Sequence, residues 1–76
     1  MDQNVIQISS DILSGMPVFR GTRVPVKNLF DYLEGGETIE SFLDGFPSVR
    51  REQVIEVLEL AERSLLPSEI LHEDIA

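Results

Sequence analysis

The chain has 76 residues, a formal net charge of −8 at pH 7, no cysteine and one histidine. This length allows a single domain, and so small a domain buries only about 60% of its unfolded surface. A disulfide and a Cys-based zinc site are excluded, so we expect support from a homodimer or a partner protein. Because no apolar run approaches the ~18 residues of a membrane helix and no signal peptide is evident, we expect a cytoplasmic protein without membrane contact.

The first 24 residues predict a short β-arm. Residues 5–8 are a strand candidate, and residues 18–20 and 23–24 predict a hairpin around Gly21 and Thr22. Glycine at the first central position is what a two-residue type II′ turn requires, because the backbone there has a positive φ.

This turn would place Arg20 directly across from Arg23, with Lys27 one helical turn further along. Like charges at that spacing repel, so the pair predicts an anion nearby. Guanidinium groups bind both phosphates and carboxylates in a bidentate manner. The anion is either external, on DNA or a partner, or it is an acid of the same fold that ties the arm to the helices. The internal candidates are Asp31, Glu34 and Asp44.

The middle of the chain predicts two helices. Pro25 suits the first position of a helix, and apolar residues then recur at i, i+3, i+4 and i+7 until residues 35–36, a glycine pair that ends the helix. Thr38 is a plausible N-cap for a second, short helix, which Gly45 and Pro47 end.

A third helix is predicted from residue 49 to about residue 66, with Ser48 as its N-cap. Its expected buried stripe is Val54, Val57, Leu58, Ala61 and Leu65. The second and third helices have the lengths and the short connection of a helix-turn-helix. We therefore predict a mainly α fold with an N-terminal β-arm: a three-helix, helix-turn-helix-like domain of the winged-helix or homeodomain-like kind over residues 1–66, with the arm in residues 1–24 and a tail in residues 67–76.

The start of the third helix is a candidate DNA contact. In a helix-turn-helix the second helix enters the major groove, and its first residues meet the bases. Here Arg50, Arg51 and Gln53 are of types that suit guanine and adenine edges. The same helix carries acids that phosphates would repel, so an ordinary solvated helix face is the alternative. These acids are Glu52, Glu56, Glu59 and Glu62.

The tail is a candidate partner-binding segment, because its apolar residues are flanked by acids. Residues 31–76 carry a net charge of −9, which favours a basic partner surface. Such a segment suits binding to a basic, apolar groove, and the alternative is an unremarkable C-terminus. The expected contacts are Glu69, Ile70, Leu71, Glu73, Asp74 and Ile75.

Residues 15–26, GMPVFRGTRVPV, resemble the start of a bacterial family known as domain of unknown function 433. The glycine pair at 35–36, the apolar segment 39–43 and Phe46-Pro47 continue the similarity. The resemblance implies a small helix-turn-helix-like fold and the role of an antitoxin, the half of a toxin–antitoxin pair that neutralises a PIN-like nuclease. It supplies no catalytic residues.

No pattern in the sequence points to catalysis, to a metal or to a cofactor. The one histidine, His72, lies near the chain end, and phosphate-loop and metal-ligand spacings are absent. We therefore expect a non-enzyme that binds a basic nuclease and, as a dimer, its own promoter DNA. The alternatives are a stand-alone DNA-binding regulator and a non-catalytic dimeric scaffold.

Overall fold

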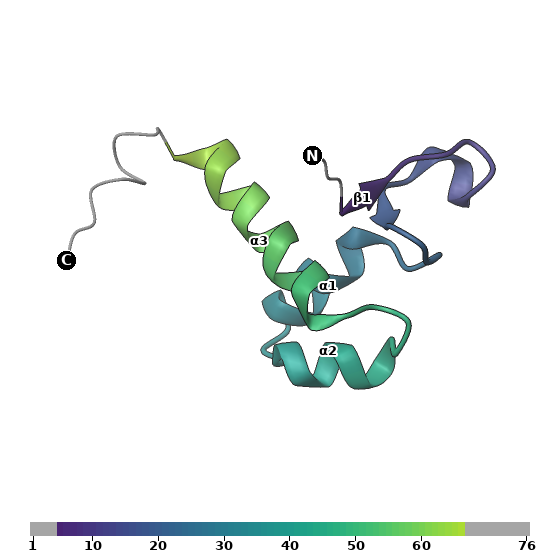
Figure 1. The fold of residues 1–76 in the computed structure, drawn as a ribbon. Helices are drawn as coiled ribbons and strands as arrows, with labels where there is room; N and C mark the ends of the chain where they lie inside the picture. Colours follow the sequence, from purple (N-terminus) through teal and green to yellow (C-terminus); the bar gives the residue numbers. More distant parts are fainter. Residues whose placement is uncertain (1–4, 67–76) are drawn as a thin grey trace.

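The computed structural model describes residues 5–66 as a mainly helical domain with a two-stranded sheet at its N-terminal end. The predicted fold class, mainly α with a short β-arm, is confirmed. In Figure 1, α2 lies across the lower end of the domain and α3 runs from it away from the arm. The elements are β1 (Ile6–Gln7), the 3-10 turn η1 (Leu13–Gly15), β2 (Val18–Phe19), α1 (Val26–Glu34), α2 (Ile39–Gly45) and α3 (Arg51–Leu65).

The sheet pairs β1 with β2 in antiparallel register, Ile6 opposite Phe19 and Gln7 opposite Val18. On its other side Val18 forms an isolated bridge with Pro25. The middle strand therefore holds both the start of the chain and the segment that leads into α1. Val18 and Phe19 are fully buried, which anchors the arm in the core.

The turn after β2 lies one residue earlier than predicted. Thr22 N–H donates to the Phe19 carbonyl at 3.0 Å, so Arg20 and Gly21 are the central residues and the type II′ assignment is wrong. Gly21 has a φ of 81° at the third position, which is the type II arrangement. The Thr22 hydroxyl accepts from Val24 N at 3.0 Å and closes the loop that carries both arginines.

The ends of α1 and α2 follow the sequence signals. Pro25 is the N-cap of α1 rather than its first helical residue. Gly36, with a φ of 89°, ends the helix in a Schellman motif, in which Glu37 N donates to the Tyr32 carbonyl at 2.9 Å. Thr38 caps α2 as predicted, since its hydroxyl accepts from Ser41 N at 3.0 Å.

The start of α3 differs from the prediction. The helix begins at Arg51 with Arg50 as N-cap, and Ser48 does not cap it. Val49, expected in the first turn, is instead buried in the core at 4% exposure. Val49 and Val54 occupy the N′ and N4 positions of a hydrophobic staple, and Gln53 at N3 supplies the capping hydrogen bond. Core burial of Val49 therefore sets the start of the helix.

The core is centred on Phe42 of α2. Its ring lies 5.8 Å from that of Phe19, 5.5 Å from Tyr32 and 5.0 Å from Phe46, between ring centroids. Offset and edge-on aromatic pairs at these distances stabilise by about 0.5–1.5 kcal/mol beyond area burial. The cluster joins the arm to all the described helices; its buried members are Val5, Phe19, Val26, Leu29, Phe42, Val49, Val54 and Val57.

Candidate functional site

Gln53 joins the arm to the start of α3. Its side-chain oxygen accepts from Arg50 N at 3.0 Å, and its side-chain nitrogen donates to the Arg20 carbonyl at 3.0 Å. The residue is only 9% exposed. We expected Gln53 to face DNA or a partner, but both ends of its amide are engaged within the fold. Its effect is to place the arm turn beside the N-terminus of α3.

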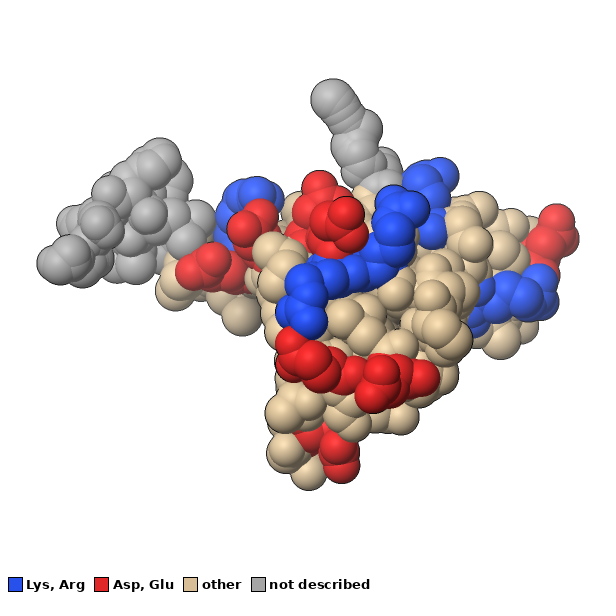
Figure 2. All heavy atoms as spheres, turned by 60° about the horizontal axis from the view of Figure 1, so that its bottom comes forward, with Lys and Arg blue, Asp and Glu red and all other residues tan. Residues whose placement is uncertain are grey.

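This bridge joins the backbone of Arg20 to that of Arg50, and Arg23 follows Arg20 in the same arm loop; we call these three exposed arginines the arginine edge. Arg20 also donates from its guanidinium to the Ile6 carbonyl at 3.3 Å, so it helps to hold β1 against β2. Arg23 makes no hydrogen bond or ion pair within residues 5–66. Figure 2 shows a band of basic side chains across one face of the molecule, with acidic groups on both sides of the band.

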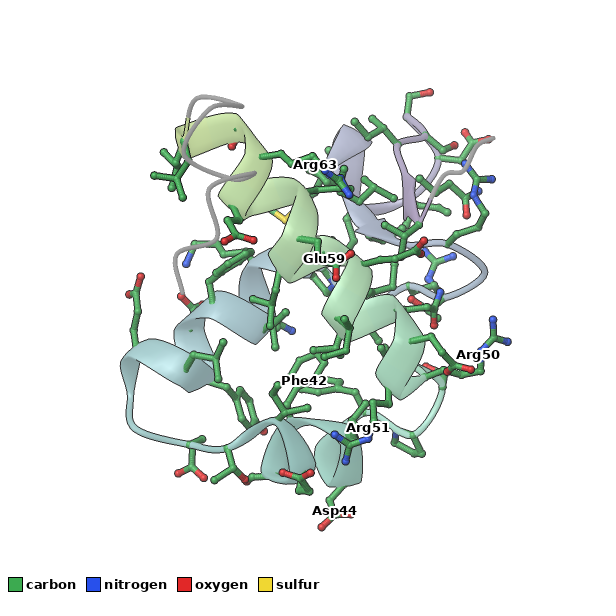
Figure 3. All side chains as sticks on the ribbon, turned by 60° about the vertical axis from the view of Figure 1, so that its left-hand side comes forward. Phe42, Asp44, Arg50, Arg51, Glu59 and Arg63 are labelled. Atoms are coloured by element: carbon green, nitrogen blue, oxygen red, sulfur yellow. The ribbon has the colours of Figure 1, made fainter. Side chains whose placement is uncertain are left out.

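The other predicted cationic contacts have partners within the fold. Arg51 pairs with Glu40 across α2 and α3, and Lys27 pairs with Asp31 at 2.9 Å along α1. Asp31 is thus taken by Lys27 and does not tie down an arginine of the arm. Figure 3 shows Arg51 beside α2, whereas Arg50 points outward from the end of α3. Arg50 lies 3.9 Å from Glu52, measured from its Nε, and is largely exposed.

The Arg51–Glu40 pair is an electrostatic contact at the surface. A hydrogen bond from the Arg51 guanidinium lowers the pKa of the Glu40 carboxyl below its usual 4.5. Both side chains are more than half exposed, and solvent-exposed pairs of this kind stabilise little. Arg51 therefore has an acidic partner within the fold.

The outer face of α3 is acidic. On its C-terminal half Arg63 lies 3.9 Å from Glu59, one helical turn away. An open hollow on the first half of this face is lined by Arg51, Glu52, Ile55 and Glu56. The exposed acids of the face are Glu52, Glu56, Glu59 and Glu62.

The apolar stripe of α3 continues beyond the core. Val54 and Val57 are buried as predicted, and Leu58 and Ala61 are half-buried. Leu65, expected in the stripe, is instead 80% exposed. The reason is geometric: in Figure 1 the last turns of α3 extend beyond α1 and α2, so none of the other elements within residues 5–66 packs over them.

The remaining predictions concern a metal site, a membrane helix and the C-terminal tail. Residues 5–66 contain no group of three or more His, Cys, Asp or Glu side chains that could hold a metal ion. In the same part of the chain no helix has the length and apolar character needed to cross a membrane. The predicted tail contacts lie outside the described residues: Glu69, Ile70, Leu71, Glu73, Asp74 and Ile75.

The sequence around the start of α3 contains a signal that indicates the observed helix start and the role of Gln53. Val49, Gln53 and Val54 occupy the N′, N3 and N4 positions of a helix whose N-cap is Arg50. Glutamine at N3 with apolar residues at N′ and N4 is the combined signature of a capping box and a hydrophobic staple. Serine at residue 48 is the stronger single N-cap signal, and for this reason the helix was predicted to start two residues too early, at residue 49.

The fold and its surfaces define a small helical domain with a β-arm, an arginine edge and an acidic helix. The chain belongs to the family described as Protein of unknown function (DUF433), whose model matches residues 6–61. It is 38% identical over 52 residues to the uncharacterized protein y4eO of Sinorhizobium fredii (strain NBRC 101917 / NGR234). The match covers 68% of this chain but only 24% of that relative, so the chain spans about a quarter of the relative's length. No solved structure matches the chain.

Proposed function

We propose that this chain is a non-catalytic binding protein, the antitoxin half of a toxin–antitoxin pair, which acts in the cytoplasm and neutralises a basic PIN-like nuclease. The observation that carries the proposal is the row of exposed carboxylates along α3. A nuclease must hold phosphates, so its substrate groove carries Lys and Arg. A rigid helix that presents carboxylates complements such a groove and competes with RNA for it.

Co-expression with the product of the adjacent gene tests the proposal, which requires that product to be a nuclease. We expect relief of growth arrest and co-purification of the two chains. Replacing Glu56 and Glu59 by Gln should weaken the complex and reduce its salt dependence, because two carboxylates of the row are lost. The matched control replaces two exposed acids outside α3, Glu34 at the end of α1 and Glu37 in the connection to α2. Growth arrest that continues with full expression of the wild-type chain would refute the proposal.

A second candidate is a DNA-binding regulator, acting alone or as a homodimer on its own promoter. The favouring observation is the arginine edge, which the Gln53 bridge assembles at the N-terminus of α3. Phosphate contacts by guanidinium groups position a protein on DNA and make its binding fall steeply with salt.

A gel shift on the DNA upstream of the gene tests this candidate. We expect a shift at low salt that Arg23→Ala and Arg50→Ala each weaken, whereas Arg63→Ala leaves it unchanged. Sedimentation of the free chain measures whether the active form is a homodimer. The candidate fails if the wild-type chain gives no shift at the lowest salt tested.

A further inference from the structure

The outer strand of the arm, β1, has one edge that is unpaired within residues 5–66. β1 pairs with β2 on one side, and the sheet has these two strands alone. Arg20 N–H donates to the Val5 carbonyl at 2.8 Å, so the backbone polar groups of Val5 face β2. Because such groups alternate along an antiparallel pair, those of Ile6 point away from β2. In an extended chain the same alternation places the groups of Ile8 on this outer edge as well.

This outer edge has little of the protection that natural edge strands carry. Such edges are usually guarded by a charged side chain, a proline or a covering segment. Residues 5–10, VIQISS, contain neither a charged residue nor a proline, and Ile8 is 65% exposed. The Ile6 carbonyl accepts from the Arg20 guanidinium at 3.3 Å, but a carbonyl oxygen has a second lone pair for another donor. The edge is therefore suited to pairing with a further strand.

The edge is complementary to a second copy of itself. When two copies pair antiparallel about a two-fold axis at Gln7, Ile6 of each copy lies opposite Ile8 of the other. The outward N–H and C=O groups of both residues are then hydrogen-bonded. Ile6 packs against the core, so the exposed Ile8 of the second copy joins an apolar contact that already exists.

The charges of the chain favour the same occupant. In this register Arg20, which lies opposite Val5, is in line with Ser9 of the second copy, so like charges do not meet across the strands. The net charge of −8 opposes close approach of two copies, and a neutral strand keeps that repulsion low at the contact. A two-fold contact uses the edge of each copy once, so it closes as a dimer instead of propagating.

We infer that β1 is the dimerisation edge of this chain. Two copies pair through β1 into one four-stranded antiparallel sheet, with Gln7 at the two-fold axis and Ile8 of each copy against Ile6 of the other. The inference goes beyond the proposed function and does not depend on it, because the interface forms from the free chain and does not use the carboxylates of α3.

Sedimentation equilibrium of the full chain measures the dimerisation Kd. Ile8→Asp should raise this Kd at least about tenfold, equivalent to about 1.4 kcal/mol, because the two-fold axis repeats the change in both Ile6–Ile8 contacts. Ile8→Pro is an independent variant, since it removes the N–H assigned to the Ile6 carbonyl of the second copy. Leu65→Asp is the matched control: Leu65 is also aliphatic and 80% exposed, but it belongs to α3, so the Kd should match the wild type.

The absence of native cysteine allows a direct test of the register. Gln7→Cys places two thiols at the two-fold axis, in a pair of residues without mutual backbone hydrogen bonds. The Cα atoms of such a pair are about 4.5 Å apart, within the roughly 4.4–6.8 Å that a disulfide spans. Mild oxidation should therefore give a covalent dimer. Ser64→Cys, on the exposed side of α3, should remain a single chain under the same conditions.

Three results would overturn the inference. They are a wild-type chain that stays monomeric up to millimolar concentration, a dimer whose Kd neither Ile8 variant changes, and a dimer that Leu65→Asp dissociates instead. Crosslinking of Ser64→Cys as fast as Gln7→Cys would overturn the register. Thermal melts verify that each variant keeps its fold. None of these measurements includes the nuclease, so a negative result leaves the proposed function standing.

Discussion

Replacing Gln53 by Met removes the hydrogen-bonded bridge between the arm and α3 without creating a cavity. Methionine has a similar length and shape but neither accepts nor donates as the amide does. The variant loses the bond from Arg50 N and the bond to the Arg20 carbonyl, each 3.0 Å long. Because Gln53 is 9% exposed, water has poor access to the two backbone groups left behind.

The expected cost follows from these two bonds. A typical hydrogen bond contributes about 0.5–1.5 kcal/mol net to stability, so the pair amounts to about 1–3 kcal/mol. For a domain of this size, each 1 kcal/mol lowers the melting temperature by roughly 4–8 °C. We therefore expect the melting temperature to fall by roughly 4–24 °C. Native domains are stable by only about 5–15 kcal/mol, so the loss is a large share of the total.

Urea unfolding followed by circular dichroism measures the change directly. Gln7→Met is the matched control, because Gln7 makes one side-chain bond of this kind, from Gly21 N at 3.1 Å, at the exposed end of the arm. Its cost should be less than half as large. A change below about 0.5 kcal/mol for Gln53→Met, the range of ordinary surface substitutions, would refute the assigned role of the bridge.

Three further predictions concern the arm and the surface pair. Gly21→Ala should cost about 1–2 kcal/mol in urea unfolding because the residue has a φ of 81°, and Gly21→Asn should cost less, since Asn tolerates this conformation. Arg20→Ala should lower the melting temperature measurably because it removes the bond to the arm backbone, whereas Arg23→Ala should leave it unchanged; equal effects would contradict the different placements. Glu40 ionises more easily when folded, so its contribution is present above the usual pKa of 4.5 and is lost as the pH falls through the lowered value. The melting-temperature difference between wild type and Glu40→Gln should therefore shrink below pH 4.5, and a difference that grows there would contradict the pairing with Arg51.

Most of the fold was predictable from local signals. The glycine pair after residue 34, Thr38 before α2 and the apolar periodicity of α1 each act within a few residues, and each prediction is confirmed. The start of α3 was not, because Ser48 is the better cap in isolation while burial of Val49 favours a later start. Tertiary packing therefore outweighed the stronger of the two local cap signals.

The site was less predictable, because it depends on contacts between residues far apart in the chain. Gln53 lies at the start of a helix among charged neighbours, so its sequence context predicts an exposed side chain. Its capping bond to Arg50 N is local, but its bond to the Arg20 carbonyl, 33 residues away, could not be read from that context. Leu65 shows the converse: its periodicity predicts burial, but the length of the core it would pack against cannot be read from the periodicity of one helix.

The distribution of charge over the surface also depends on contacts between residues far apart in the chain. Along the sequence, residues 1–30 are weakly basic and residues 31–76 strongly acidic. In the fold, Arg50 of the acidic part joins Arg20 and Arg23 of the basic part, while Glu40 neutralises Arg51. The net charge of a segment therefore does not give the charge of a face. A chain with a net charge of −8 presents a local basic edge at one end of α3 and acids around an apolar stripe at the other, so overall acidity alone does not exclude contact with phosphate.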